Sequence, residues 1–339
     1  MLTNSSIAIT SFALIIYFTA LTNLLHSQVY KCVDSKGNAL YSNSPCPQNT
    51  EEQNYKPIES FTINDETVDP EVEDLTETEQ TSQNFGAGEL DINIVQVRLS
   101  LPAQQITAIH KGVHFVYDYF KEVYGITPGT DINIKIFGRH GDFLGYQKRL
   151  IGKIYSESGI FSSRTGEALV NASKYRGEVV GISIHEACHA MIHQAGYRIP
   201  VWVNEGIAEY FETIEISDNQ VLFRPQYDRH SEIASLLSKK ELISLLEYFG
   251  LSNNVWKNRN LVEDRTSRSI AYSLVHYLMS SVEGTESIKK ILKNFSVSDE
   301  TPSMFVVNQS YSGGLNLLEK NWHEYLRQTP SGHVFSTNQ

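Results

Sequence analysis

The sequence predicts an α+β protein in which a small sheet comes first and a mostly helical half follows. Residues 91–101, 131–137 and 159–172 alternate apolar and polar side chains, as half-buried strands do. The last of these stretches is expected to form two strands around Arg164-Thr165-Gly166. After residue 179 the spacing of apolar residues is mostly helical. Strands followed by helices, rather than alternating with them, are typical of the α+β class.

Five further segments are predicted to be helices. Residues 103–124 form an amphipathic pattern, because their apolar positions recur every three or four residues: Ile106, Ile109, Val113, Val116 and Tyr117. Later segments with the same periodicity are residues 239–249, 266–282, 286–295 and 316–327. Together with the strands they define one domain over residues 91–328, which is long enough to bury a substantial core.

The N-terminal segment is an export signal by its composition. An apolar run over residues 7–25 precedes the polar residues 26–28, and no lysine or arginine occurs before Lys31. We expect residues 1–27 to be a cleaved secretory signal peptide. The run is also long enough for an uncleaved membrane anchor, which remains the alternative. In either case the rest of the chain is expected to be exported.

Residues 28–48 have the pattern of a β-hairpin with a glycine-containing turn over residues 35–38. Cys32 and Cys46 are expected to pair in an oxidising compartment, and the closed loop would contribute about 3 kcal/mol to a module too small for a real core. The stretch resembles a small domain of unknown function found at the N-termini of many bacterial envelope proteins. That resemblance implies a Gram-negative periplasm. We expect the module to be a folded spacer, with ligand binding through its two tyrosines as the alternative.

Residues 49–90 are predicted to be an acidic, disordered linker. Twelve acidic residues lie between residues 51 and 90 with Lys56 as the single basic one, so this segment carries the same charge of −11 as the whole chain. Low hydrophobicity with like charges is typical of an extended spacer, and a pro-segment covering the cleft is the alternative. The rest of the chain is electrically balanced, so a basic nucleic-acid-binding surface is not indicated and no nucleic acid is expected as a partner. Residues 329–339 are expected to be a flexible tail.

The motif H-E-x-x-H stands at His185-Glu186-Ala187-Cys188-His189 within a helical pattern. Residues four apart share one face of a helix, so His185 and His189 can present their rings to one metal ion. Glu186 lies about 100° around the helix from His185, where it can hold and deprotonate a water molecule. Cys188, between the histidines, is interpreted as a small buried residue.

A catalytic zinc site needs a third protein ligand. His193 continues the series but lies about 12 Å along the helix from His185, too far to share one ion. Pro200 opens a second helical segment, Val201-Trp202-Val203-Asn204-Glu205-Gly206, after a short loop. The sequence therefore predicts Glu205, on this neighbouring helix, as the third ligand.

HEACH followed by WVNEGIAEYFE resembles the gluzincin metallopeptidases, and most closely their bacterial peptidase MA-like members, over roughly residues 90–330. The resemblance implies a two-helix zinc site beside a small sheet, with His185, His189 and Glu205 as ligands and Glu186 as general base. It also implies Asn204 and Glu209 as partners of the two histidine rings. The metzincin extension is absent because Ile192 occupies its glycine position.

The aminopeptidase signature G-x-M-E-N is also absent, and residues 159–163 at its expected place contain no acid to hold a substrate amine. An endopeptidase is therefore predicted. Tyr272 lies on a helix that resembles the tyrosine-bearing helix of many peptidase MA-like proteins, and it is predicted to stabilise the oxyanion. His276, one turn further along, is the second candidate for that role.

The predicted function is thus a secreted, zinc-dependent endopeptidase that acts on a peptide or protein substrate. A zinc-binding but weakly active envelope scaffold is one alternative, against which the intact Glu186 argues. A toxin-like or wall-remodelling hydrolase with a single partner substrate is the other, and it would share the same site.

Overall fold

A computed structural model provides the coordinates, and the chain divides into two compact units, Met1–Lys56 and Pro57–Gln339. The structure describes residues 30–33, 39–42, 51–53, 80–84, 90–217, 220–251, 255–256, 266–297 and 301–336. The predicted signal peptide and most of the predicted linker lie outside these residues.

The first unit contains a three-stranded antiparallel sheet with the strand order β2-β1-β3. Strands β1 (Tyr30–Val33) and β2 (Ala39–Ser42) pair as the predicted hairpin requires, with Tyr30 opposite Ser42. Strand β3 (Glu51–Gln53) pairs with β1 and lies in the predicted linker, so the prediction ended this module too early. Main-chain pairing holds β3, and the apolar alternation used to find strands is absent from its sequence.

The second unit is built on a five-stranded sheet with the order β4-β5-β6-β8-β7. Strands β5 (Asp91–Val97), β6 (Asp131–Phe137) and β8 (Glu167–Asn171) are parallel, whereas β4 (Gln80–Asn84) and β7 (Gly159–Ser162) are antiparallel edges. The predicted strands are confirmed. Strand β4 corrects the predicted linker, because its polar sequence joins the sheet through main-chain bonds to β5.

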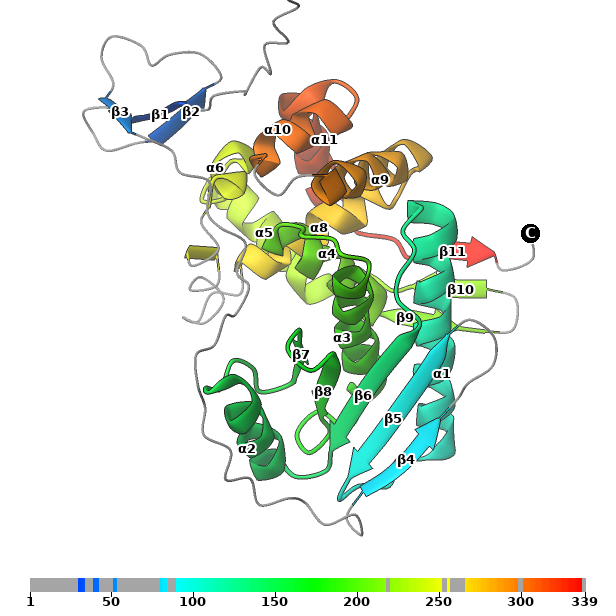
Figure 1. Ribbon diagram of the computed structural model, residues 1–339. Coiled ribbons are helices and arrows are strands. Elements are labelled where there is room, and N and C mark those ends of the chain that lie inside the picture. The colour runs from blue at the N-terminus through cyan, green and yellow to red at the C-terminus, as the bar shows by residue number, and fades with distance from the viewer. Residues whose placement is uncertain are drawn as a thin grey trace, which may run out of the picture. The chain divides into compact units, whose positions relative to one another are not determined.

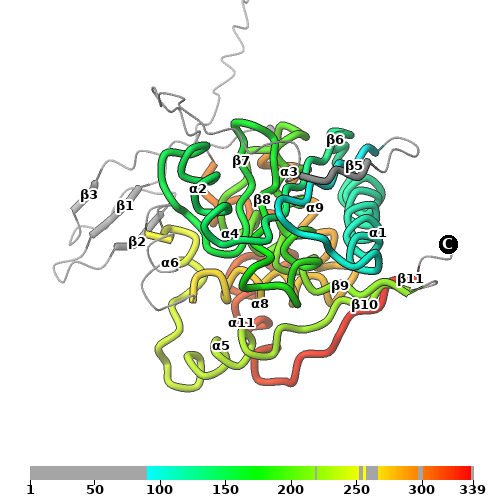
Figure 2. The backbone as a smooth tube through the Cα atoms, turned by 90° about the horizontal axis from the view of Figure 1, so that it is seen from below, coloured from blue at the N-terminus to red at the C-terminus, as the bar shows by residue number. Residues whose placement is uncertain are grey.

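Both faces of this sheet are covered, which explains the isoleucine-rich strands. Ile92 and Ile94 lie beside Ile132 and Ile134 in register, and all four are buried. On the other face the core consists of side chains from β5, β6, β8 and α2 (His140–Ile151): Val97, Phe137, Leu169 and Phe143. Figure 2 shows α1 and α2 on opposite sides of the strands.

The predicted helix over residues 103–124 is α1 (Ala103–Tyr119), which continues as a short π-helix, Phe120–Tyr124. Gly125 ends it with a φ of 69°, a conformation that glycine adopts without strain. Helix α1 packs against α3 (Val179–Gln194), and α3 also contacts β6, β7 and β8. This arrangement places the H-E-x-x-H helix directly beside the sheet (Figure 1).

The helical half follows α3 and agrees in most segments with the prediction. Its helices are α4 (Val201–Glu212), α5 (Tyr227–Lys239), α6 (Leu245–Phe249), α8 (Thr266–Leu278), α9 (Val282–Val297), α10 (Ser303–Ser310) and α11 (Gly314–Leu326). The prediction of one helix over residues 239–249 was wrong. Lys240 adopts a left-handed conformation that ends α5, and the Ser244 hydroxyl caps α6 by accepting a hydrogen bond from the Glu247 N–H.

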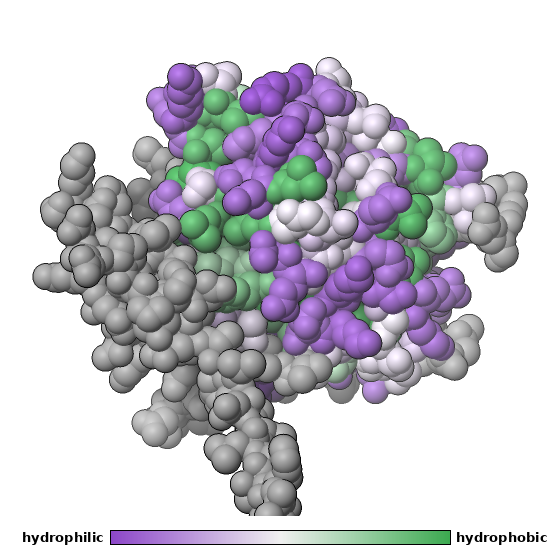
Figure 3. All heavy atoms as spheres, turned by 90° about the horizontal axis from the view of Figure 1, so that it is seen from above, coloured by the Kyte–Doolittle hydropathy of each residue, from purple (hydrophilic) through white to green (hydrophobic). Residues whose placement is uncertain are grey.

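A second small sheet with the order β11-β10-β9 joins distant parts of the chain: β9 (Ile214–Ile216), β10 (Gln220–Phe223) and β11 (His333–Ser336). Strand β11 lies within the predicted flexible tail and corrects it, since β11 pairs with β10 along its whole length. Among the described residues, none of the helices combines the length and apolarity needed to cross a bilayer. Figure 3 shows hydrophilic and hydrophobic residues interspersed over one face of the molecule.

Candidate metal centre

Helix α3 carries His185, Glu186 and His189 in a largely buried position. His185 is 5% exposed and Glu186 is 6% exposed. The helix is buried around most of its circumference, because the sheet, α1 and α4 all contact it. The H-E-x-x-H motif therefore belongs to a core helix, and surface histidines are excluded as its explanation.

Helix α4 brings Glu205 to the two histidines. One Glu205 carboxylate oxygen lies 3.7 Å from Nε2 of His185 and the other lies 3.7 Å from Nε2 of His189. The two Nε2 atoms are 3.2 Å apart. The structure thus brings together the three residues that the sequence predicts as ligands, with one donor atom of each within 4.8 Å of the others.

The outer nitrogen of each histidine ring has its own acceptor. Nδ1 of His189 lies 3.1 Å from the Asn204 side-chain oxygen, where the sequence predicts a partner. Nδ1 of His185 lies 2.9 Å from a carboxylate oxygen of Glu212. Glu209 was predicted for a histidine ring and is corrected to Glu212, which lies three residues further along α4. Helical periodicity alone cannot choose between Glu209 and Glu212 as the partner of the histidine ring, because both lie on the face of α4 that carries Glu205.

Glu209 instead binds two arginines that sequence reasoning did not single out. Its carboxylate, 1% exposed, lies 2.8 Å from Nη2 of Arg229 and 3.4 Å from Nε of Arg268. Arg268 also places Nη2 2.6 Å from Glu205. The close approach of α4 and α8 makes this contact, since a Cβ at Gly206 would lie 2.8 Å from the Ala271 carbonyl oxygen.

These donors fit a divalent metal ion. Glu212 and Asn204 can accept hydrogen bonds from the Nδ1 atoms, so the neutral rings would turn both Nε2 atoms toward the metal position as lone-pair donors. Two nitrogens bound to tetrahedral zinc at about 2.0–2.1 Å lie roughly 3.3 Å apart, close to the observed 3.2 Å. Two imidazoles and one carboxylate leave a fourth position open, as in catalytic zinc sites.

The charge of the surrounding network also fits a dication. It contains four carboxyl groups and two guanidinium groups in a largely buried cluster: Glu186, Glu205, Glu209, Glu212, Arg229 and Arg268. A divalent cation would be stabilised by this excess of carboxyl groups.

Burial and neighbouring charges shift the pKa values in this cluster. Burial raises the pKa of Glu186 to about 7 and lowers that of His189 to about 4. Burial alone would lower the pKa of His185, but hydrogen bonds to Glu205 and Glu212 outweigh it and raise that pKa. Burial alone would raise the pKa of Glu205, but the charge of Arg268 holds it well below its usual range. Glu186 thus has the pKa of a base that works near neutrality.

The Glu186 pKa predicts how the metal-free protein responds to a Glu186→Gln substitution. The folded-state pKa of about 7 exceeds the ordinary value of 4.5, so ionising this carboxyl destabilises the fold as pH rises from 4.5 through 7. Glutamine removes that effect. We expect urea denaturation of the metal-free variant to show about 2–3 kcal/mol more stability than wild type at pH 8, and no such gain near pH 4.5. An equal difference at both pH values would contradict the shift.

Tyr272 and His276 are engaged elsewhere on α8. Tyr272 is 2% exposed, and its hydroxyl accepts a 2.7 Å hydrogen bond from the Gln226 N–H, just before α5. His276 is buried, and its Nδ1 lies 2.7 Å from the Tyr325 hydroxyl. The structure shows no contact of either side chain with His185, His189 or Glu205 among the described residues. These bonds engage neither the Tyr272 hydroxyl proton nor Nε2 of His276, so the predicted role of either residue at the oxyanion stays a prediction.

The cysteines differ in how far the structure describes them. Cys188 is free and fully buried on α3, and burial raises the pKa of its thiol. Cys46 lies outside the described residues, so the Cys32–Cys46 disulfide stays a prediction.

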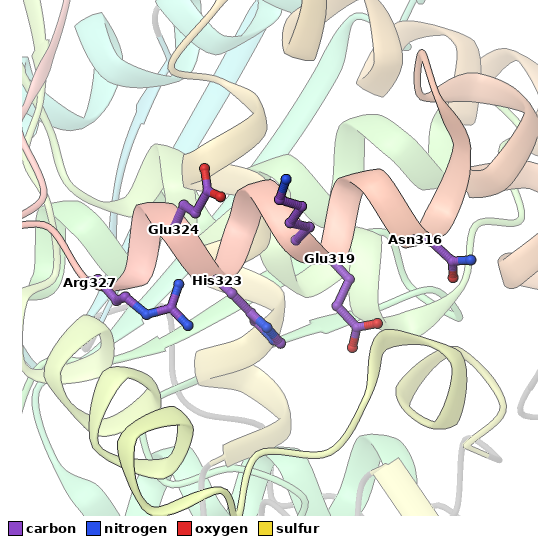
Figure 4. Close-up of a pocket in the computed structure, with 6 residues that line it drawn as sticks. Asn316, Glu319, His323, Glu324 and Arg327 are labelled. Carbon is purple, nitrogen blue, oxygen red and sulfur yellow. The ribbon is translucent and has the colours of Figure 1, made fainter.

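An open surface pocket lies along α11. None of the residues that line it belongs to the metal centre. Its lining residues come from this helix and from its C-cap, Arg327: Asn316, Glu319, Lys320, His323, Glu324 and Arg327. Figure 4 shows Glu319, His323 and Arg327 on one side of α11 and Glu324 on the other. The Glu319 carboxylate accepts a hydrogen bond from the Leu245 N–H at the start of α6. This contact gives Glu319 a structural role.

Two family models, both described as of unknown function, match segments of the chain. Residues 18–61 match a domain of unknown function, DUF4124, and residues 179–301 match a protein family of unknown function, DUF1570. The first match agrees with the predicted small N-terminal domain, and the second range contains the three predicted ligands, Glu186 and Arg268. No curated protein matches.

Among solved structures, one similar chain is an M1 zinc metallopeptidase from Deinococcus radiodurans, with 10% identity and a TM-score of 0.38, over 75% of this chain and 54% of that one. Another is a mutant of a two-domain M1 zinc metallopeptidase bound to L-arginine, with 11% identity, a TM-score of 0.38 and the same coverage. The chain thus spans about half the length of these structures.

Proposed function

We propose that the protein is a zinc-dependent endopeptidase. The observation that carries this proposal is the convergence of two imidazole Nε2 atoms and one carboxylate, 3.2–3.7 Å apart, with a second carboxylate, Glu186, on the helix that carries both histidines. Three protein ligands with an open position distinguish catalytic from structural zinc sites. His185, His189 and Glu205 would hold the ion.

A bound zinc ion would supply a Lewis acid that polarises the scissile carbonyl and acidifies water. Glu186 takes one proton from the attacking water as the water oxygen bonds to the carbonyl carbon. The same carboxyl then gives this proton to the nitrogen as the C–N bond breaks. Glu212 and Asn204 fix the two imidazole rings in the tautomer that leaves Nε2 unprotonated.

The β7 edge supports a peptide as substrate. Gly159, its first residue, lies against the Glu186 carboxylate, since a Cβ there would come within 2.7 Å of the Glu186 Oε1. Strand β7 pairs only with β8 within the described sheet, so its other edge can bind an extended peptide through main-chain hydrogen bonds.

The polarity of this edge supports internal cleavage. The nearest upstream acid, Glu157, is half exposed and lies 2.8 Å from the Lys174 ammonium. No carboxylate of residues 159–162 is available to hold a substrate amine. The edge therefore favours an endopeptidase over an aminopeptidase.

A peptide-library digest tests this function. The purified chain without residues 1–27, loaded with one equivalent of zinc, is expected to cleave library peptides at internal bonds, as detected by mass spectrometry. Removal of zinc with a chelator should abolish cleavage, and added zinc should restore it. Zinc binding without cleavage of any peptide would favour the alternative of an envelope scaffold. Cleavage confined to one partner protein would favour a single-target hydrolase.

We further propose an exported, periplasmic location, with a membrane tether as the alternative if residues 7–25 are not removed. The apolar run at the N-terminus and the match of residues 18–61 to a separate small domain support this proposal.

A further inference from the structure

Arg268 occupies the rim of the ligand set. Its Nη2 lies 2.6 Å from the Glu205 oxygen that is itself 3.7 Å from Nε2 of His185. The arginine side chain is 37% exposed, whereas the Glu205 side chain is only 15% exposed. The Arg268 side chain is therefore more exposed to solvent than the predicted ligand that it contacts.

The position of Arg268 is fixed by a buried carboxylate. Glu209 holds its Nε at 3.4 Å, and Glu209 is fixed in turn by Arg229 and by the Gln226 side-chain amide, whose Nε2 lies 3.2 Å away. Gly206 allows α8 to approach α4 closely enough for these contacts. A guanidinium held in this way needs little reorganisation when negative charge develops beside it.

Arg268 also differs from the other candidates on its helix. Tyr272 follows one turn later and is buried against the Gln226 N–H, and His276 is buried against Tyr325. Of the three side chains, Arg268 alone contacts a predicted ligand among the described residues. It is also the only cation of the three, because burial lowers the pKa of His276 to about 3.

We propose that Arg268 is the catalytic residue that stabilises the oxyanion during peptide hydrolysis, in place of Tyr272 or His276. This inference rests on the proposed function. As the water oxygen bonds to the carbonyl carbon, the π electron pair moves to the carbonyl oxygen and the proton moves to Glu186. Arg268 donates a hydrogen bond to that oxygen while it is negative. When the C–N bond breaks, the electron pair returns to the carbonyl and the charge disappears.

The test compares Arg268→Gln, Arg268→Lys, Arg224→Gln and Tyr272→Phe in the zinc-loaded chain. For Arg268→Gln we expect kcat to fall about 10²–10³-fold with little change in KM and with one zinc per chain retained. Arg268→Lys keeps the charge and should recover part of kcat. Arg224→Gln, the same change at an exposed arginine just after β10, should leave kcat unaltered, and Tyr272→Phe should lower kcat much less than Arg268→Gln does.

Inhibitor binding provides a readout that is independent of turnover. A phosphinic peptide built on the best library sequence carries a tetrahedral anion, whereas a thiol peptide of the same sequence does not. Calorimetry of Arg268→Gln should show weaker phosphinic binding by about the same factor as kcat. Binding of the thiol peptide should be unchanged.

Several outcomes in an active wild-type background would overturn the assignment. The first is loss of zinc in proportion to activity, which would make Arg268 only a positioning residue for Glu205. The second is equal weakening of both inhibitors. The third is a fall of kcat in Tyr272→Phe but not in Arg268→Gln. A zinc-loaded wild type that cleaves no peptide overturns the proposed function as well, whereas an active wild type beside a fully active Arg268→Gln overturns the role of Arg268 alone.

Discussion

Replacement of Glu186 by glutamine is expected to lower kcat for peptide cleavage by about 10²–10⁴-fold while zinc content stays at one per chain. The amide has nearly the shape of the carboxyl group but cannot accept the proton from water. Glu186 lies outside the ligand set of His185, His189 and Glu205, so coordination should survive. Steady-state kinetics and metal analysis of the same sample measure both effects.

Glu215→Gln is the control for this substitution. Glu215 is an exposed carboxylate on β9 that pairs with Arg224, and its replacement should leave kcat and zinc content unaltered. Peptide cleavage by Glu186→Gln at the wild-type rate would show that another group accepts the proton. Loss of zinc from Glu186→Gln would show that Glu186 is needed for metal binding, which contradicts its assignment as the general base alone.

Replacement of Gly159 by alanine is expected to have the second-largest effect. The new Cβ would lie 2.7 Å from Oε1 of Glu186 and 2.6 Å from a methyl carbon of Ile182, both closer than real Cβ contacts allow. Either the carboxylate or β7 must move. Because displacement of a catalytic group by about 1 Å can lower the rate about 10²-fold, we expect kcat to fall by roughly that factor. Kinetics with the best library peptide measure it.

Gly177→Ala is the matched control, since a Cβ at Gly177 meets no atom within 4 Å and its backbone is unstrained. It should leave kcat unchanged. Zinc content is expected to stay at one per chain in both variants, because neither glycine contacts the ligands. A wild-type kcat in Gly159→Ala would contradict this prediction. It would show that contact with β7 does not hold the Glu186 carboxylate in its catalytic position.

The sequence predicted the parts of the fold that are set by burial periodicity. Strands such as β6, with buried Ile132, Ile134 and Ile136, and helices such as α1 show the side-chain spacing of their burial. Strands β3, β4 and β11 were missed because their sequences lack an apolar alternation, and main-chain pairing places them in sheets. Helix α2 was missed because only three of its side chains are buried.

In the candidate site, too, residues set by local helical spacing were predicted, whereas those set by the packing of distant segments were not. Local spacing predicted His185, His189 and Glu205, since helix geometry alone brings the two histidines to one face. Arg268 could not be found in this way, because it lies 63 residues after Glu205 and only the packing of α8 on α4 joins them. Glu212 was within reach of the periodicity, because it lies seven residues after Glu205 on the same helical face.

Zinc stoichiometry of wild type and Glu205→Ala after dialysis near pH 7.5 tests the central claim most directly. The account predicts one zinc per wild-type chain and less than about one-tenth in Glu205→Ala, because two imidazoles alone leave the ion with too few protein ligands. Glu215→Ala should retain one zinc. Full zinc occupancy in Glu205→Ala, or none in wild type, would contradict the account.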